Sequence, residues 1–173
     1  MYVIIGASGN TGSVVAKTLL GLNQKVRVVG RSQGRLQALT SEGAEAAIAD
    51  VYDAPALAKA FTGARAVYAM IPPNMTSENY RGDQDRATKA IADAIRQAGV
   101  EYAVSLSSVG ADKPSGNGPI AGLHHLEQTL NQIPGLNVLH LRPGYFMENL
   151  LAQIGVIQTM GITAGPLLAD LKI

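Results

Sequence analysis

The stretch Val3-Ile4-Ile5-Gly6-Ala7-Ser8-Gly9-Asn10-Thr11-Gly12 decides the fold of this chain. Its three glycines are spaced three residues apart, after a short apolar run and before a segment of helical periodicity. Gly6 permits a sharp turn, Gly9 lacks a Cβ where a phosphate would approach the backbone, and Gly12 lets a helix pack closely on a strand. The free N–H groups of the helix's first turn then face an anion. The stretch therefore predicts a strand, a tight turn and a helix that hold a dinucleotide by its pyrophosphate.

Short apolar runs alternate with segments of helical periodicity along the rest of the chain. With right-handed crossovers, this alternation predicts a Rossmann-like α/β fold, a doubly wound parallel β-sheet of about six strands with helices on both faces. The strand order expected for such a sheet is 3-2-1-4-5-6. The predicted strands are Tyr2–Ile5, Lys25–Gly30, Ala44–Ala49, Ala66–Ile71, Tyr102–Ser107 and Asn137–Leu141.

Length and composition narrow the class of protein. The chain has 173 residues, 47% of them hydrophobic, which is enough for one domain with a substantial core. Its net charge of +1 provides no attraction for nucleic acid or an anionic membrane. The absence of cysteine excludes disulfides and thiol catalysis, and the three histidines show no metal-ligand spacing. With no membrane-length apolar stretch or signal-peptide pattern, we expect a soluble, cytoplasmic protein.

Further motifs resemble those of one family. They are Met70-Ile71-Pro72-Pro73-Asn74, Ser107-Ser108-Val109-Gly110-Ala111, Gly122-Leu123-His124-x-x-Glu127 and Leu141-Arg142-Pro143-Gly144-Tyr145-Phe146-Met147-Glu148-Asn149. With the glycine loop, they make the chain resemble the NmrA-like branch of the atypical short-chain dehydrogenase/reductases. The resemblance implies an NAD(P)-binding Rossmann domain over residues 1–150. Because family members are usually longer, it also implies that 151–173 begin an incomplete C-terminal substrate-binding region.

The same resemblance implies a function. It indicates an NAD(P)H-dependent oxidoreductase that transfers hydride to a small electrophile such as a quinone. The chain lacks the Tyr-x-x-x-Lys pair of the wider superfamily, since no tyrosine lies between Tyr102 and Tyr145. This departure leaves open a non-catalytic redox sensor that binds NAD(P) and regulates a protein partner. It argues against a sugar epimerase, whose chemistry needs the tyrosine base.

The predicted cofactor-binding residues come from the glycine loop and from the ends of the strands. Arg31 ends the second strand, where an arginine can pair with a 2′-phosphate, so we expect NADP(H) to be preferred over NAD(H). Arg35 adds a second charge, and the alternative for both is a solvated charge in a helix's first turn. Thr11 is placed to cap the helix, to contact a phosphate oxygen, or both. Asp50 lies beside adenine in similar proteins, or caps the next turn, and Met70 to Pro72 flank the nicotinamide-side ribose or simply end a strand. The full set is Gly6, Ser8, Gly9, Asn10, Thr11, Gly12, Arg31, Asp50, Met70, Ile71, Pro72 and Ser107.

The candidate catalytic residues lie at the end of the fifth strand and in the helix after it. Ser107 occupies the position of the superfamily's catalytic serine and could bond a substrate carbonyl, or only nearby backbone. His124 matches a family position and could pass a proton, or be a surface residue of a helix. His140 lies within the sixth predicted strand and is expected to be structural.

The segment after the sixth strand predicts contacts with other molecules. Tyr145 and Phe146 are expected to line the pocket of a small-molecule substrate, although an aromatic pair before a helix also suits a core. The apolar segment Ile157–Ile173 favours self-association, which makes a homodimer possible.

Overall fold

A computed structural model of the chain describes residues 1–163. The contacts within it divide the chain into two units, one from Met1 to Arg142 and one from Pro143 onward. The functional boundary expected at residue 150 stays a prediction.

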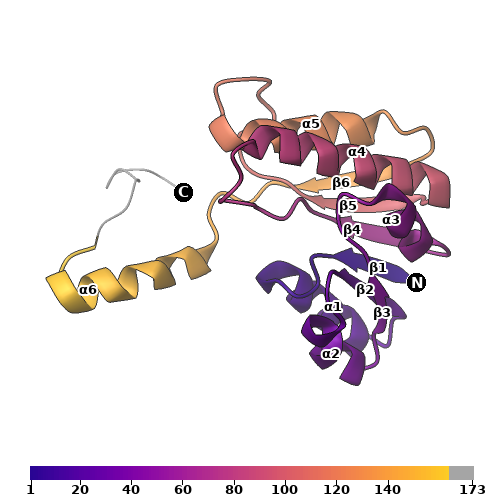
Figure 1. Cartoon of the computed structure of the whole chain (residues 1–173), viewed down its shortest axis with the longest axis horizontal. Coiled ribbons are helices and arrows are strands. Elements are labelled where there is room, and N and C mark those ends of the chain that lie inside the picture. The colour runs from indigo at the N-terminus through magenta and orange to yellow at the C-terminus, as the bar shows by residue number, and fades with distance from the viewer. Residues whose placement is uncertain (164–173) are drawn as a thin grey trace. The chain divides into compact units, whose positions relative to one another are not determined.

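The first unit contains one parallel sheet in the order β3-β2-β1-β4-β5-β6, which confirms the predicted topology (Figure 1). Only the first and last strands keep their predicted bounds. The fourth ends before Met70, because the chain turns away ahead of Pro72 and Pro73, which have no N–H to donate to a ladder. The strands are β1 Tyr2–Ile5, β2 Val26–Gly30, β3 Glu45–Ile48, β4 Ala66–Ala69, β5 Tyr102–Leu106 and β6 Asn137–Leu141.

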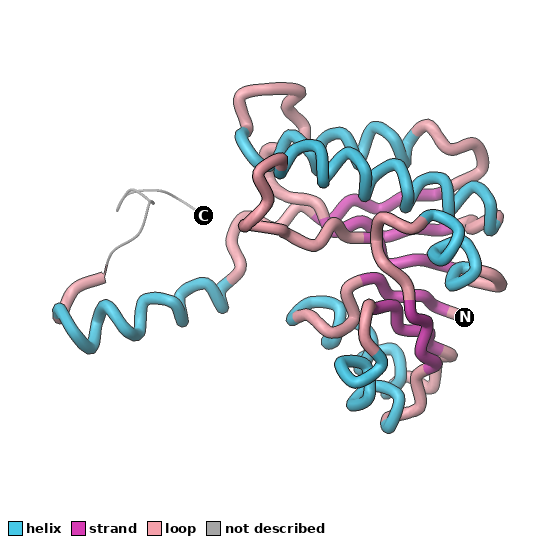
Figure 2. The backbone as a smooth tube through the Cα atoms, in the orientation of Figure 1, coloured by secondary structure: helices cyan, strands magenta, loops and turns pink. Residues whose placement is uncertain are grey.

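Helices lie on both faces of this sheet, as predicted (Figures 1 and 2). Two of them, α1 (Asn10–Gly21) and α2 (Gln33–Ser41), pack on one face. The other face carries α3 (Ala54–Phe61), α4 (Tyr80–Ala98) and α5 (Ala121–Asn131), the last preceded by a 3-10 turn at Gly118–Ile120.

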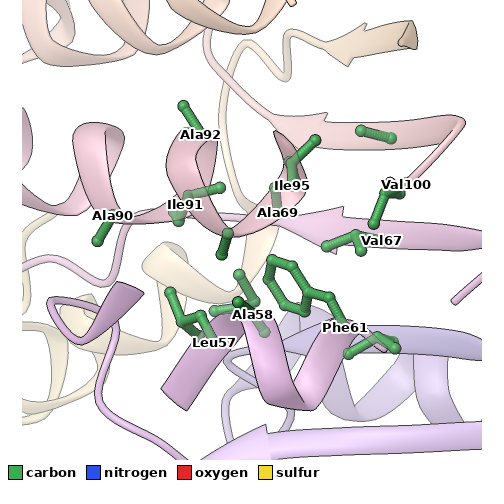
Figure 3. Close-up of a cluster of buried hydrophobic side chains, with 14 of the residues drawn as sticks. Leu57, Ala58, Phe61, Val67, Ala69, Ala90, Ile91, Ala92, Ile95 and Val100 are labelled. Atoms are coloured by element: carbon green, nitrogen blue, oxygen red, sulfur yellow. The ribbon is translucent and has the colours of Figure 1, made fainter. Parts of the chain in front are cut away.

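Two apolar clusters, one on each face, hold these layers together. The larger joins α3, α4 and α5 to the sheet, and Figure 3 shows Leu57 and Phe61 of α3 among residues of β4 and α4. Phe61, Ile91 and Ile95 are completely buried. The smaller cluster packs Ala16 of α1 and Leu36 of α2 on β1 and β2. Burial of this kind is the main stabilising term for the fold.

The sheet is less covered at its β6 edge than the sequence suggested. Leu139 is 59% exposed and Leu141 42%, although both lie on a strand expected to be buried on both faces. The reason is the distribution of the helices. Two helices cover one face of the six strands and three cover the other, which leaves part of β6 uncovered.

The second unit, as far as the structure describes it, contains a 3-10 helix at Met147–Gln153 and α6 at Ile154–Met160. Leu150, Leu151 and Ile157 are exposed there. Much of the apolar segment for which self-association is expected, residues 164–173, lies outside the described residues.

Candidate functional site

The glycine loop joins β1 to α1 and folds as the sequence predicts. Gly6 has a φ of +69°, which favours glycine, and its carbonyl accepts a hydrogen bond from the N–H of Gly9 at 2.9 Å. A Cβ on Gly12 would lie 2.4 Å from the carbonyl oxygen of Gly6. The turn at Gly6 and the close packing at Gly12 are therefore confirmed, whereas the approach of a phosphate to Gly9 stays a prediction.

Thr11 does not cap the helix, so that part of its predicted role is wrong. Gly9 is the N-cap residue, with a φ of −94° and a ψ of 176°, and no side chain caps this end. The helix begins at Asn10, which places Thr11 inside its first turn. The first-turn amides are thus left without a side-chain acceptor, which suits an anionic ligand.

A pocket of about 400 Å³ opens where β1, β2, β3 and β4 end. Seven of the predicted cofactor residues line it, and five do not. The seven are Gly6, Ser8, Gly9, Arg31, Asp50, Met70 and Pro72. The others, Asn10, Thr11, Gly12, Ile71 and Ser107, are not among its lining residues.

Several lining residues were not predicted. Val29 and Leu57 are core residues by pattern, and nothing in their spacing indicates that they also border a pocket. Tyr52 and Asn74 come from the loops after β3 and β4. Their positions just beyond strand ends were the available signal, because ligands bind at the carboxyl edge of such sheets.

The charged residues of the pocket are two arginines and one aspartate. Arg31 and Arg35 both line it, and within residues 1–163 neither forms a salt bridge. Asp50 Oδ1 accepts a hydrogen bond from the N–H of Tyr52 at 3.0 Å, so the turn-capping role holds while the side chain still borders the pocket. The two guanidinium groups thus outnumber the single carboxylate, which favours a ligand with an extra negative charge.

Ser107 belongs to a buried network at the ends of β5 and β6. Its Oγ donates a hydrogen bond to Glu127 Oε1 at 2.5 Å, and Arg142 binds the same carboxylate from Nε at 2.9 Å and from a terminal nitrogen at 2.5 Å. Glu127 is 1% exposed and Ser107 4%. Glu127 and Arg142 belong to the family motifs, but the sequence alone indicated no role for either residue. Their signal was a carboxylate between the apolar positions Leu126 and Leu130 of an amphipathic helix.

This network fixes the protonation of its members. Burial raises the pKa of Glu127, but the hydrogen bonds from Arg142 and Ser107 outweigh burial and bring that pKa below its usual range. The ionised carboxylate accepts only, so the Ser107 proton points to Glu127. Donation to a substrate carbonyl, the role expected of Ser107, is unavailable in this arrangement. Its hydroxyl can only accept from a ligand.

The histidines make separate contacts. His124 Nδ1 lies 2.7 Å from the carbonyl oxygen of Ala111, which can only accept, so Nδ1 carries the proton and Nε2 is left for a ligand. His125 faces Asp85 of α4 at 3.8 Å. His140 bridges Ser105 at 2.6 Å and Asn131 at 3.0 Å, and burial lowers its pKa. Its structural role is therefore supported by its contacts.

Tyr145 and Phe146 belong to the second unit, where both are half-buried and Phe146 precedes the 3-10 helix. Across residues 1–163 no group of three or more His, Asp or Glu side chains could hold a metal ion. No helix in that part of the chain is both long and apolar enough to span a bilayer.

Comparisons with known proteins identify the family of the chain. A family model described as NAD(P)H-binding matches residues 6–161. The NmrA-like family domain-containing oxidoreductase himF of Aspergillus japonicus is 34% identical over 164 residues, covering 87% of this chain and 48% of that protein. The NAD(P)H azoreductase of Xenophilus azovorans is 27% identical over 163 residues, covering 93% and 54%. The chain thus spans about half the length of these curated relatives.

A solved structure supports the fold. The NADPH-dependent quinone oxidoreductase QOR2 of Escherichia coli, complexed with NADPH, aligns with a TM-score of 0.79 at 24% identity, covering 93% of this chain and 55% of that one. The resemblance drawn from the sequence motifs is confirmed by these relatives. The chain belongs to the NAD(P)H-binding family, and NmrA-like oxidoreductases are among its relatives.

Proposed function

We propose that the pocket at the ends of β1 to β4 holds the adenosine and pyrophosphate portion of NADP(H). The observation that carries this proposal is the glycine loop. Gly9 is exposed and borders the pocket, and the packing at Gly12 brings the N-terminus of α1 close to the end of β1. Backbone N–H groups and the positive end of the helix dipole then face the same space, which is the arrangement that a pyrophosphate needs.

The remaining predicted residues are assigned around this anchor. Ser8, Asn10 and Thr11 contact phosphate oxygens from the loop and the first turn. Asp50 accepts from the amino group of adenine, beside its turn hydrogen bond. Met70 to Pro72 flank the ribose on the nicotinamide side.

The two arginines are the basis of the proposed preference for NADP(H) over NAD(H). Arg31 and Arg35 border it without a salt-bridge partner in the described residues, so a 2′-phosphate would supply the missing anion. A planar guanidinium binds phosphate through paired, charge-assisted hydrogen bonds. NADP(H) is therefore favoured over NAD(H), which offers only ribose hydroxyls at this point.

The proposed reaction is the reduction of a small electrophile such as a quinone. The reduced cofactor supplies a hydride, and the acceptor also needs a proton. Nε2 of His124 is the candidate relay, because Nδ1 donates to Ala111; Nε2 would take a proton from water and pass it to the reduced acceptor. Ser107 would accept a hydrogen bond from the ligand, and Tyr145 and Phe146 would contact the substrate.

A redox sensor is the second candidate, and one observation favours it. The Ser107 proton is held by Glu127, which deprives the site of a hydroxyl donor. An assay with NADPH and menadione separates the two functions. Loss of NADPH absorbance that depends on menadione and slows in His124→Ala supports the reductase. Saturable NADPH binding without consumption, across several quinones, would support the sensor instead.

A further inference from the structure

Two of the unpredicted lining residues, Tyr52 and Asn74, come from loops that are distant in the sheet. Tyr52 lies between β3 and α3, and Asn74 follows β4. Strands β2 and β1 separate β3 from β4 in the strand order, so the two loops border the pocket from its two sides. The ladders of the sheet set the spacing of the strands, and a contact between the loops themselves would in addition fix their side chains.

Two side chains of α4 provide that contact. Asp83, in the first turn, accepts a hydrogen bond from Asn74 Nδ2 at 3.1 Å and from a terminal nitrogen of Arg86 at 2.6 Å. The Arg86 guanidinium lies 5.0 Å from the centroid of the Tyr52 ring, within cation–π range. Asn74, Asp83, Arg86 and Tyr52 thus form a continuous bridge, which we call the α4 bridge.

The charges in the α4 bridge suit its geometry. Hydrogen bonds from Ser77 and Arg86 hold the pKa of Asp83 below its usual range, so the carboxylate keeps Arg86 in place at neutral pH. Burial, and next the charge of Asp83, raise the pKa of Tyr52, so its phenol stays neutral. Arg86 occupies one face of the ring, while Tyr52 remains 38% exposed and lines the pocket. The ring therefore has a second face to offer to a ligand.

We propose that Tyr52 is the aromatic wall against which the purine base of the dinucleotide stacks, and that Asp83 and Arg86 are positioning residues that hold its ring. This inference rests on the proposed function, because it needs a dinucleotide in the pocket. A base presents a flat π surface that a tyrosine ring matches, and a cation on the far face strengthens the ring's hold. The α4 bridge makes helix α4 part of the binding site, although its own side chains do not line the pocket.

The test measures calorimetric affinity for NADPH and for adenosine 2′,5′-bisphosphate, a fragment without nicotinamide. We expect Tyr52→Leu to weaken both ligands about 10-fold, because stacking is lost, and Tyr52→Phe to restore most of that affinity. Arg86→Met should weaken both about 3-fold, with rescue by Arg86→Lys. Arg81→Met is the matched control, since Arg81 pairs with Asp85 on the same helix and does not line the pocket. It should leave both affinities unchanged.

Folding is checked by thermal unfolding, since Arg86 is 67% exposed and its replacement should leave the midpoint unchanged. If wild type binds both ligands and Tyr52→Leu and Arg86→Met bind as tightly, the stacking inference is overturned and the proposed function stands. If Arg86→Met weakens binding only together with a lower unfolding midpoint, the positioning role is overturned. Failure of wild type to bind either ligand would overturn the proposed function and this inference with it.

Discussion

The Ser107 hydroxyl lies 2.5 Å from Glu127 Oε1 and donates its proton to that carboxylate. Glu127 is 1% exposed and its only charged partner in the network is Arg142, whose side chain is 40% exposed. A residue that the sequence suggested as a catalytic donor is thus joined to a buried ion pair that links β5, β6 and α5. The two partners differ in solvent exposure, because Arg142 can turn to solvent and Glu127 cannot.

This difference in exposure predicts that removing either charge lowers the free energy of unfolding by a different amount. Arg142→Met strands a buried carboxylate and should lower the free energy of unfolding by about 3 kcal/mol. Glu127→Leu should cost less, because Arg142 regains water, although Ser107 loses its acceptor. Urea unfolding of both variants and of the double variant measures this. Equal losses of stability in the two single variants, or a double variant less stable than Arg142→Met, would contradict the claim that Arg142 compensates the buried carboxylate of Glu127.

The pH dependence of stability follows from the same pair. Because the pKa of Glu127 is lowered in the folded state, its stabilising effect is present above its ordinary value of 4.5 and is lost as pH falls through the folded pKa. In Arg142→Met, burial acts with less opposition and raises that pKa, so the variant should gain stability on acidification toward pH 5, roughly the range of a raised carboxyl. Unfolding free energies measured across this range check this prediction. Relative to wild type, Arg142→Met should therefore gain unfolding free energy as pH falls toward about 5, whereas the wild-type loss from Glu127 begins only below its ordinary value of 4.5.

The contacts of His140 predict a second loss of stability on acidification, at higher pH than that of Glu127. Its Nε2 faces the acceptor Oδ1 of Asn131, so Nδ1 accepts from Ser105 and the ring is neutral. Since burial lowers the pKa of His140, stability is highest above its ordinary value of 6.5 and falls as pH drops below that value. His140→Asn should reduce this slope between pH 7.5 and 5.5, roughly the range in which a histidine titrates. An unchanged slope in urea unfolding would remove His140 as its source.

Replacing two glycines of α1 by alanine distinguishes an effect on packing from an effect on helix propensity. Gly12→Ala places a Cβ 2.4 Å from the Gly6 carbonyl oxygen, so the loop must shift. We expect a loss of about 1–3 kcal/mol in the free energy of unfolding and of most NADPH affinity. Gly21→Ala is the control on the same helix, because its Cβ would meet nothing within 4 Å. It should leave binding intact, and binding by Gly12→Ala at the wild-type level would refute the proposed pyrophosphate site.

The proposed preference for NADP(H) over NAD(H) makes Arg31 the residue to test. Arg31→Ala should weaken NADPH about 10-fold, the value of a charge-assisted contact to phosphate, and leave NADH unchanged. Arg65→Ala provides a matched control, since Arg65 is exposed and does not line the pocket. Calorimetric titrations of both variants with both cofactors give the ratio, and a ratio unchanged in Arg31→Ala would exclude the 2′-phosphate contact.

Sequence periodicity predicted the fold well because parallel strands buried under helices leave a strong local pattern. The turn at Gly6 and the close contact at Gly12 were readable because few residues other than glycine fit them. The cap at Thr11 was misassigned because helix starts depend on backbone geometry that several nearby residues can satisfy. The exposure of β6 depends on how many helices cover each face of the sheet, and no local sequence pattern encodes that number.

The pocket residues were predictable where the glycine loop or a strand end marked them. Arg31, Asp50 and Met70 stand at such ends and do line the pocket. Tyr52, Asp83 and Arg86 come together from a loop and a helix that are distant in sequence, so their contact needs the tertiary structure. The burial of Glu127 likewise depends on Arg142, which approaches from the end of β6.

Dinucleotide binding is tested by a calorimetric titration of the 173-residue chain with NADPH and then with NADH. We expect saturable micromolar binding of NADPH and binding of NADH weaker by about 10-fold, the difference expected of one phosphate contact. Equal affinities would contradict the role of the arginines. No binding of either cofactor would contradict the central claim that the glycine loop and its pocket hold a dinucleotide.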